Sequence, residues 1–144
     1  MLGRMVVGGL IVVLVWCAVS DARTGRIPNT VTLPAIGVVA VLATLEPAVA
    51  WGAAVCAAPY LIAFARRLCG GADVKLAVVC GGVLADPASA AAVVVGSAVI
   101  TGCVLAVRRR TVVVHGPALV STTLAWLVID SVAASGTIDA CCVG

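Results

Sequence analysis

The segment MVVGGLIVVLVWCAVSDARTGRIPN, residues 5–29, joins a long apolar run to a short polar one. Residues 5–18 carry no charged side chain, and Asp21 then appears with two arginines and a Pro-Asn pair behind it. A continuous apolar run of this kind is typical of a membrane-spanning helix. The carboxylate at its end is either an ordinary charge at the membrane interface or one half of a catalytic pair.

The composition of the whole chain also favours the membrane. Its 144 residues are 63% hydrophobic and 10% charged, and the mean hydropathy is +1.26. A soluble domain averages about 45–50% apolar and about 25% charged residues. The chain therefore has too little polar surface to cover a globule in water. We predict an all-α, polytopic membrane protein in which residues 1–144 form a single membrane-embedded domain.

Apolar runs separated by charged residues, proline or glycine predict a bundle of about six transmembrane helices. Tight turns that pair an acid with a proline separate the second run from the third and the fourth from the fifth. The fourth run is short, and we expect its helix to extend back through Asp73. The Gly-Gly pairs at residues 8–9 and 81–82 are expected to be helix-packing contacts. The predicted spans are approximately 4–20, 30–46, 49–65, 74–86, 88–107 and 112–134.

The seven cysteines predict neither a disulfide framework nor a metal site. Their number is odd, they lie mostly in apolar runs, and no two have the CxxC spacing. The single histidine, His115, supplies no partner set for zinc. We expect most cysteines to pack between helices as small apolar side chains. Cys69 is the exception worth testing, because of the motif beside it, and we predict no cofactor.

The basic residues predict the orientation of the bundle. If the loop after the first span faces the cytoplasm, every Lys and Arg except Arg4 lies on the inner side, as the positive-inside rule requires. Both termini are then outside. We expect the basic residues to set the topology and to contact anionic lipids, and His115 to lie at the interface. The inner basic residues are Arg23, Arg26, Arg66, Arg67, Lys75, Arg108, Arg109 and Arg110.

Asp21 and Asp73 are the two acids that lie among these inner basic residues. Because the first and fourth spans run in opposite directions, the end of one and the start of the other share one membrane depth. A compact bundle can bring the two carboxylates together there. Two neighbouring carboxylates share a proton, so one can deprotonate water while the other polarises a carbonyl and protonates the leaving amine. This is aspartic-protease chemistry, and the chain offers no other convincing catalytic set.

Simpler roles remain open for each aspartate taken alone. Asp21 can be an interfacial charge that caps the next segment or pairs with Arg23, and Asp73 can cap a helix N-terminus. Gly70 and Gly71, directly before Asp73, allow close backbone approach and unusual backbone angles. An extended substrate strand would need such access beside the carboxylate.

The segments DARTGRIPNTVTLP (residues 21–34) and GGADVKLA (residues 70–77) together resemble the prepilin peptidase family. The resemblance implies that Asp21 and Asp73 are the catalytic pair, the first followed by I-P-N and the second in a G-x-G-D-x-K context. Ala72 stands where the second glycine of that motif is usual. The residues expected to bind substrate or to shape the site are Gly70, Gly71, Ala72, Lys75, Arg26, Pro28 and Asn29.

A third segment, HGPAL at residues 115–119, resembles the Gly-Pro turn that opens the family's last helix. The resemblance implies a membrane aspartic endopeptidase of the bacterial inner membrane, with its active site at the cytoplasmic face. It further implies a short, peptidase-only form without a cytosolic zinc-binding or methyltransferase domain. The implied partners are the lipid bilayer and prepilins or pseudopilins of type IV or Flp/Tad-type pili. These would be cut after glycine, between a basic leader and a hydrophobic helix.

Two other classes of function fit the same composition. One is a noncatalytic scaffold of pilus assembly. The other is a small proton-coupled transporter, since transporters also use paired membrane aspartates. A transporter would more naturally place them near the midplane of the bilayer, whereas Asp21 and Asp73 are expected at its inner edge. No nucleic-acid partner is implied, and the oligomeric state is left open.

Overall fold

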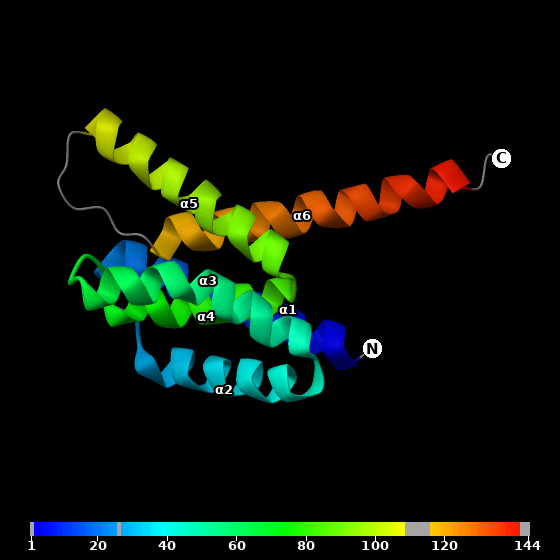
Figure 1. Cartoon of the computed structure of the whole chain (residues 1–144), viewed down its shortest axis with the longest axis horizontal. Helices are drawn as coiled ribbons and strands as arrows, with labels where there is room; N and C mark the ends of the chain where they lie inside the picture. Colours follow the sequence, from blue (N-terminus) through cyan, green and yellow to red (C-terminus); the bar gives the residue numbers. More distant parts are fainter. Residues whose placement is uncertain (1, 26, 109–115, 142–144) are drawn as a thin grey trace.

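The structure is a computed structural model that describes residues 2–25, 27–108 and 116–141, which form six α-helices and no β-strand (Figure 1). The prediction of an all-α, polytopic membrane protein is confirmed. Four helices are long and apolar enough to cross a membrane, whereas the second has 17 residues and the fourth has 14. The helices are α1 (Leu2–Thr24), α2 (Asn29–Leu45), α3 (Pro47–Ala65), α4 (Gly71–Leu84), α5 (Pro87–Arg108) and α6 (Gly116–Cys141).

Local sequence signals set the ends of these helices. Gly25 follows α1 with a backbone φ of +63°, which glycine adopts without steric cost, and its N–H donates to the Asp21 carbonyl at 2.8 Å. Asp86 accepts a hydrogen bond from the Ser89 N–H at 2.7 Å and so caps the start of α5, where Pro87 is the first helical residue. The acid-proline turn between the fourth and fifth helices is therefore confirmed.

The short helix α4 is the centre of the bundle and contacts all five of the other helices. Its backbone approaches α3 closely, because an added Cβ at Gly81 would lie 2.6 Å from Cys56 Cβ and 2.8 Å from Ala53 Cα. An added Cβ at Gly82 would lie 2.5 Å from Val39 Cγ1 of α2. Small residues allow this close approach in membrane bundles, so the predicted packing role of the second glycine pair is confirmed.

The first glycine pair behaves differently. Gly8 and Gly9 are exposed on α1, and a Cβ added at either would meet nothing within 4 Å. The prediction that they pack against another helix is therefore wrong for the described part of the chain. Large apolar side chains on the same helix, such as Val12 and Trp16, are 69% and 63% exposed. An apolar outer surface of this kind is expected where lipid takes the place of water.

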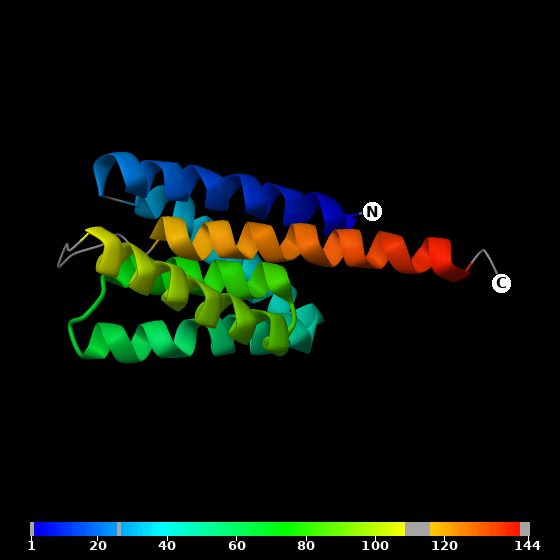
Figure 2. The same cartoon turned by 90° about the horizontal axis from the view of Figure 1, so that it is seen from above.

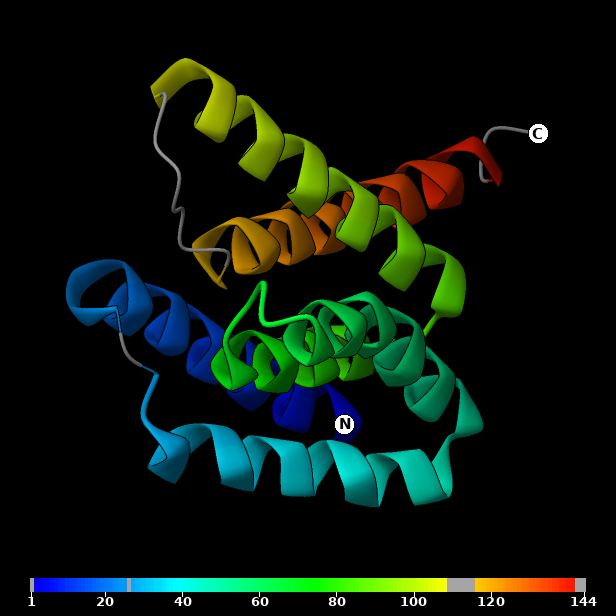
Figure 3. The same cartoon turned by 60° about the vertical axis from the view of Figure 1, so that its left-hand side comes forward.

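The two ends of the bundle differ in charge. One end gathers the C-terminal ends of α1, α3 and α5 and the N-terminal ends of α2, α4 and α6 (Figures 1, 2 and 3). The opposite end holds Glu46 and Asp86 in its turns. We call the first of these the basic end, because its described residues include Arg23, Arg66, Arg67 and Lys75. Arg26, Arg109, Arg110 and His115 lie outside the described residues, as does the expected start of the sixth span at 112–115.

Candidate active site

Asp21 lies within the last turn of α1, at the basic end, and not beyond the end of the helix. The apolar run predicts a span that stops near residue 20, but the helix continues to Thr24. Polar residues are compatible with a helix, and Gly25 is the first residue whose conformation ends it. The Asp21 side chain is buried, with 7% of its surface exposed. Arg23, two residues later, is exposed, so the buried carboxyl is not simply part of a charged surface.

Asp73 lies in the first turn of α4. Its carboxylate Oδ2 accepts the Gly70 N–H at 3.2 Å, and its own N–H donates to the Gly70 carbonyl at 3.1 Å. The capping role considered for Asp73 is therefore present in the structure. The side chain is only half-buried, so water and peptide can still reach it. The carboxylate thus has both a fixed position and access from outside the bundle.

The glycines before Asp73 are not needed for unusual backbone angles. Gly70 has an ordinary extended conformation, with φ of −83° and ψ of 154°, and Gly71 is the first residue of α4. A Cβ added at Gly70 would lie 3.9 Å from Asp73 Oδ2, and one added at Gly71 would lie 3.5 Å from the Phe64 ring. What the two glycines provide is uncovered backbone beside the carboxylate, and Ala72 next to them is half-buried.

The bundle brings the two aspartates to the same place. α1 and α4 are in contact, and the two carboxyl groups are close enough to interact electrostatically. The shared membrane depth expected from the sequence is thus accompanied by proximity in space. Two carboxyl groups in this arrangement exchange protons as a coupled pair, which is the property that acid–base hydrolysis of an amide needs.

The buried Asp21 carboxyl packs against the start of α6. Its Oδ2 atom has no hydrogen-bond partner within the described ranges, and it occupies the space that a Cβ on Gly116 would need. A buried polar atom without a partner is rare in folded proteins, and a catalytic role is one of its few physical explanations. The absence of a side chain on Gly116 therefore makes room for this carboxyl.

Residues 9–107 match the type IV leader peptidase family, a stretch that contains both aspartates and the helices that carry them. The chain belongs to this family. It is accordingly a leader-peptidase-type protease with several apolar helices suited to a membrane. No curated protein and no solved structure matches the chain significantly.

A hydrogen bond of 2.7 Å from Lys75 Nζ to Asn29 Oδ1 connects α4 of this peptidase to the start of α2. Pro28, with φ of −69°, immediately precedes that helix. The two sequence motifs, which are far apart along the chain, are thus joined at the basic end by a direct side-chain contact. Arg26, which was grouped with them from the sequence, lies outside the described residues.

Two residues that the sequence did not assign to the site lie near Asp73. Tyr60 of α3 and Cys69 of the α3–α4 connection both interact electrostatically with the Asp73 carboxylate. Burial, and secondarily the Asp73 charge, raises the pKa of the Cys69 thiol above its ordinary value. The Cys69 Sγ–H donates to the Tyr60 carbonyl at 3.4 Å. Cys69 is therefore held as a neutral thiol that supports the turn before α4, in keeping with a packing role.

The contact between Gly116 and Asp21 was also not predicted. The only signal for it was the Gly-Pro pair at the start of the last helix, which marks a helix start but does not say what lies against it. Among the described residues, no group of three or more His, Cys, Asp or Glu side chains is placed to hold a metal ion.

Proposed function

We propose that this peptidase is an aspartic endopeptidase in which Asp21 and Asp73 act together on a water molecule. The ionised carboxylate takes a proton from the water, whose oxygen attacks the carbonyl carbon of the peptide bond. The protonated carboxyl donates a hydrogen bond to the carbonyl oxygen and later transfers its proton to the leaving amine. The products are a new carboxyl terminus and a new amino terminus. The observation that carries this proposal is the meeting of a buried, unpartnered Asp21 carboxyl with the accessible carboxyl of Asp73.

The proposed substrates are prepilins or pseudopilins of type IV or Flp/Tad-type systems, cut after glycine between a basic leader and a hydrophobic helix. Glycine at the cut favours local unwinding of the substrate, because glycine is a poor helix former. Two features of the chain support this choice: family membership and exposed glycine backbone beside Asp73. The proposed location is the bacterial inner membrane, with the basic end at the cytoplasmic face, as the positive-inside rule favours.

Cleavage of a co-expressed prepilin tests this proposal. The wild-type chain is expected to produce a shortened pilin, and both Asp21→Asn and Asp73→Asn are expected to lower the cleavage rate by at least about 100-fold, the usual contribution of one acid–base group. Asparagine has nearly the same shape and caps helices as well as aspartate does, so folding is expected to be preserved.

The matched control is Asp86→Asn, because Asp86 is an acid at the opposite end of the bundle. This variant is expected to cleave at the wild-type rate. Cleavage that persists in both Asp21→Asn and Asp73→Asn would rule out the carboxyl pair, and the scaffold and transporter alternatives would then gain support.

A further inference from the structure

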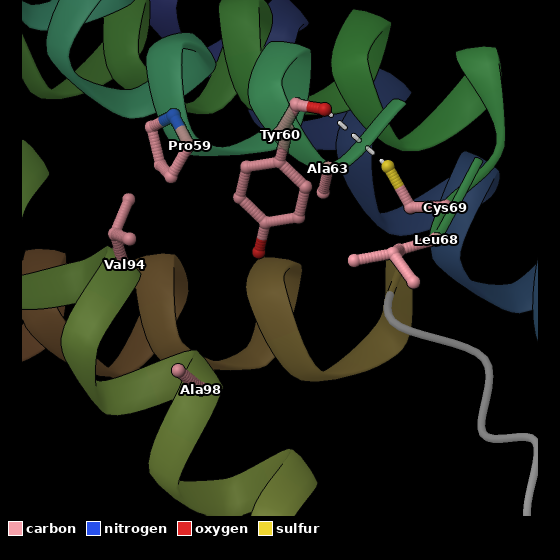
Figure 4. A pocket seen from close by; sticks show the side chains of 7 residues that line it. All are labelled: Pro59, Tyr60, Ala63, Leu68, Cys69, Val94 and Ala98. Atoms are coloured by element: carbon pink, nitrogen blue, oxygen red, sulfur yellow. Dashed lines mark hydrogen bonds between the residues drawn. The ribbon is translucent and has the colours of Figure 1, made fainter. Parts of the chain in front are cut away.

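A cavity of about 290 Å³ lies between α3 and α5, beside the proposed catalytic pair. Tyr60 and Ala63 line it from α3, Leu68 and Cys69 from the α3–α4 connection, and Val94 and Ala98 from α5 (Figure 4). We call it the α3–α5 cavity. It is not part of the carboxyl pair, and the motifs recognised in the sequence do not include its walls.

The walls of the α3–α5 cavity suit an apolar group. Its side chains are aliphatic, except for the Tyr60 phenol and the Cys69 thiol. Both of these polar groups already have partners: the Tyr60 hydroxyl lies 3.3 Å from Ser97 Oγ, and the Cys69 thiol donates to the Tyr60 carbonyl at 3.4 Å. A charged or strongly polar ligand would find few free hydrogen-bonding groups here and would lose its hydration.

The position of the cavity connects it to the catalytic pair. Cys69 in its wall directly precedes Gly70, whose N–H is bound by the Asp73 carboxylate. Asp73 also interacts electrostatically with both Tyr60 and Cys69. A peptide whose scissile bond reaches Asp73 along the exposed Gly70 backbone therefore passes the mouth of this cavity. A side chain next to that bond can enter it.

We propose that the α3–α5 cavity binds the side chain of the substrate residue that directly follows the scissile bond, and that this residue is large and apolar. The inference rests on the proposed peptidase function. Of the two sides of the cut, the leader is basic and would not enter an apolar cavity, so the occupant comes from the hydrophobic helix. The neighbouring surfaces of α3 and α5 are also apolar and exposed, with Leu61 at 52% and Val95 at 63%. The rest of that helix can therefore lie against the same face.

The test uses a purified model substrate with a lysine-rich leader, one glycine and an apolar helix that begins with Ala, Leu or Phe. Wild-type protein is expected to cleave the Leu or Phe substrate about ten-fold or more faster than the Ala substrate, as loss of one apolar contact in a pocket implies. Ala98→Leu narrows the cavity and is expected to reduce the Phe-to-Ala preference by about ten-fold. The control is Ala91→Leu, an exposed alanine on the same helix outside the cavity, which should keep the wild-type preference.

A second measurement locates the side chain directly. A photoreactive benzophenone residue replaces the first residue of the apolar helix, and the Asp73→Asn variant holds the substrate uncut. Crosslinks are expected on α3 or α5 at the cavity walls, and Ala98→Leu should diminish them.

The outcomes separate the two proposals. If wild-type protein cleaves, but the three substrates do so at equal rates or Ala98→Leu slows all of them alike, the cavity inference fails and the peptidase proposal stands. If wild-type protein does not cleave any substrate, but the crosslinks map to the cavity, the catalytic proposal fails and the binding inference stands. No cleavage and no crosslink at these walls would overturn both.

Discussion

Replacement of Gly116 by alanine tests whether the position of the Asp21 carboxyl matters for cleavage. The added methyl group would overlap Asp21 Oδ2 and lie 3.4 Å from its Cγ and 3.8 Å from its Cβ. The carboxyl is buried, so it has little free space into which it can turn. Either the side chain leaves its preferred rotamer or the start of α6 moves away.

The size of the effect follows from these two routes. A side chain forced about 30° away from its rotamer costs about 0.5–1.5 kcal/mol, which is small compared with the stability of a folded bundle. Displacement of a reacting group by about 1 Å costs about 100-fold in rate. We therefore expect Gly116→Ala to lower kcat/KM by about 100-fold, while the unfolding temperature falls by only a few degrees.

The assay compares cleavage of the model substrate with thermal unfolding in detergent. The matched control is Gly102→Ala in α5, because an added Cβ there meets nothing within 4 Å, and alanine favours a helix interior by about 0.5–1 kcal/mol over glycine. Gly102→Ala should cleave at the wild-type rate and unfold at the same or a higher temperature. Wild-type cleavage by Gly116→Ala would refute the argument, as would a loss of activity that only reflects unfolded protein.

Four further results are expected. Lys75→Met removes the 2.7 Å hydrogen bond to Asn29 and should lower stability by about 1 kcal/mol, measured by thermal unfolding; an unchanged unfolding temperature would show that the contact contributes nothing. Cys69→Ser should retain most cleavage activity, and near-total loss would contradict a packing role. EDTA should leave cleavage unchanged, because the carboxyl pair supplies both acid and base; strong inhibition would count against this mechanism. Hydrogen bonds from Ser89 hold the pKa of Asp86 below its ordinary value, so the stability they give is complete above about pH 4 and is lost as pH falls through the lowered pKa. The unfolding temperatures of wild type and Asp86→Asn should therefore converge in acid, and a gap that widens would contradict the assignment.

The sequence predicted the helices well because the signals for them are local. Apolar runs, Pro87 and the capping residue Asp86 are each sufficient to place an end of a helix within a few residues. The end of α1 was placed too early, because loss of hydropathy marks where lipid contact ends and not where helical hydrogen bonds stop. Gly25, four residues later, is the signal that mattered.

The candidate site could be predicted only in part. The shared depth of Asp21 and Asp73 follows from the order and direction of the spans. The contact of Asp21 with Gly116 depends on how α1 packs against α6, and residues so distant in sequence leave no local pattern. The α3–α5 cavity is missed for the same reason, because Tyr60 and Ala98 look like ordinary lipid-facing or core positions until the two helices are placed side by side.

The shortness of α4 has a consequence for the surrounding bilayer. Its 14 residues extend about 21 Å, whereas the hydrocarbon layer is about 30 Å thick. A helix that begins at the inner boundary of a flat bilayer would fall short of the other side, and one centred in it would hold Asp73 below the headgroups. Lipid near this helix must therefore thin or water must enter from the inner face. Hydrophobic mismatch of this kind makes the rate of hydrolysis depend on acyl-chain length, with shorter chains favouring the supply of water to the carboxyl pair.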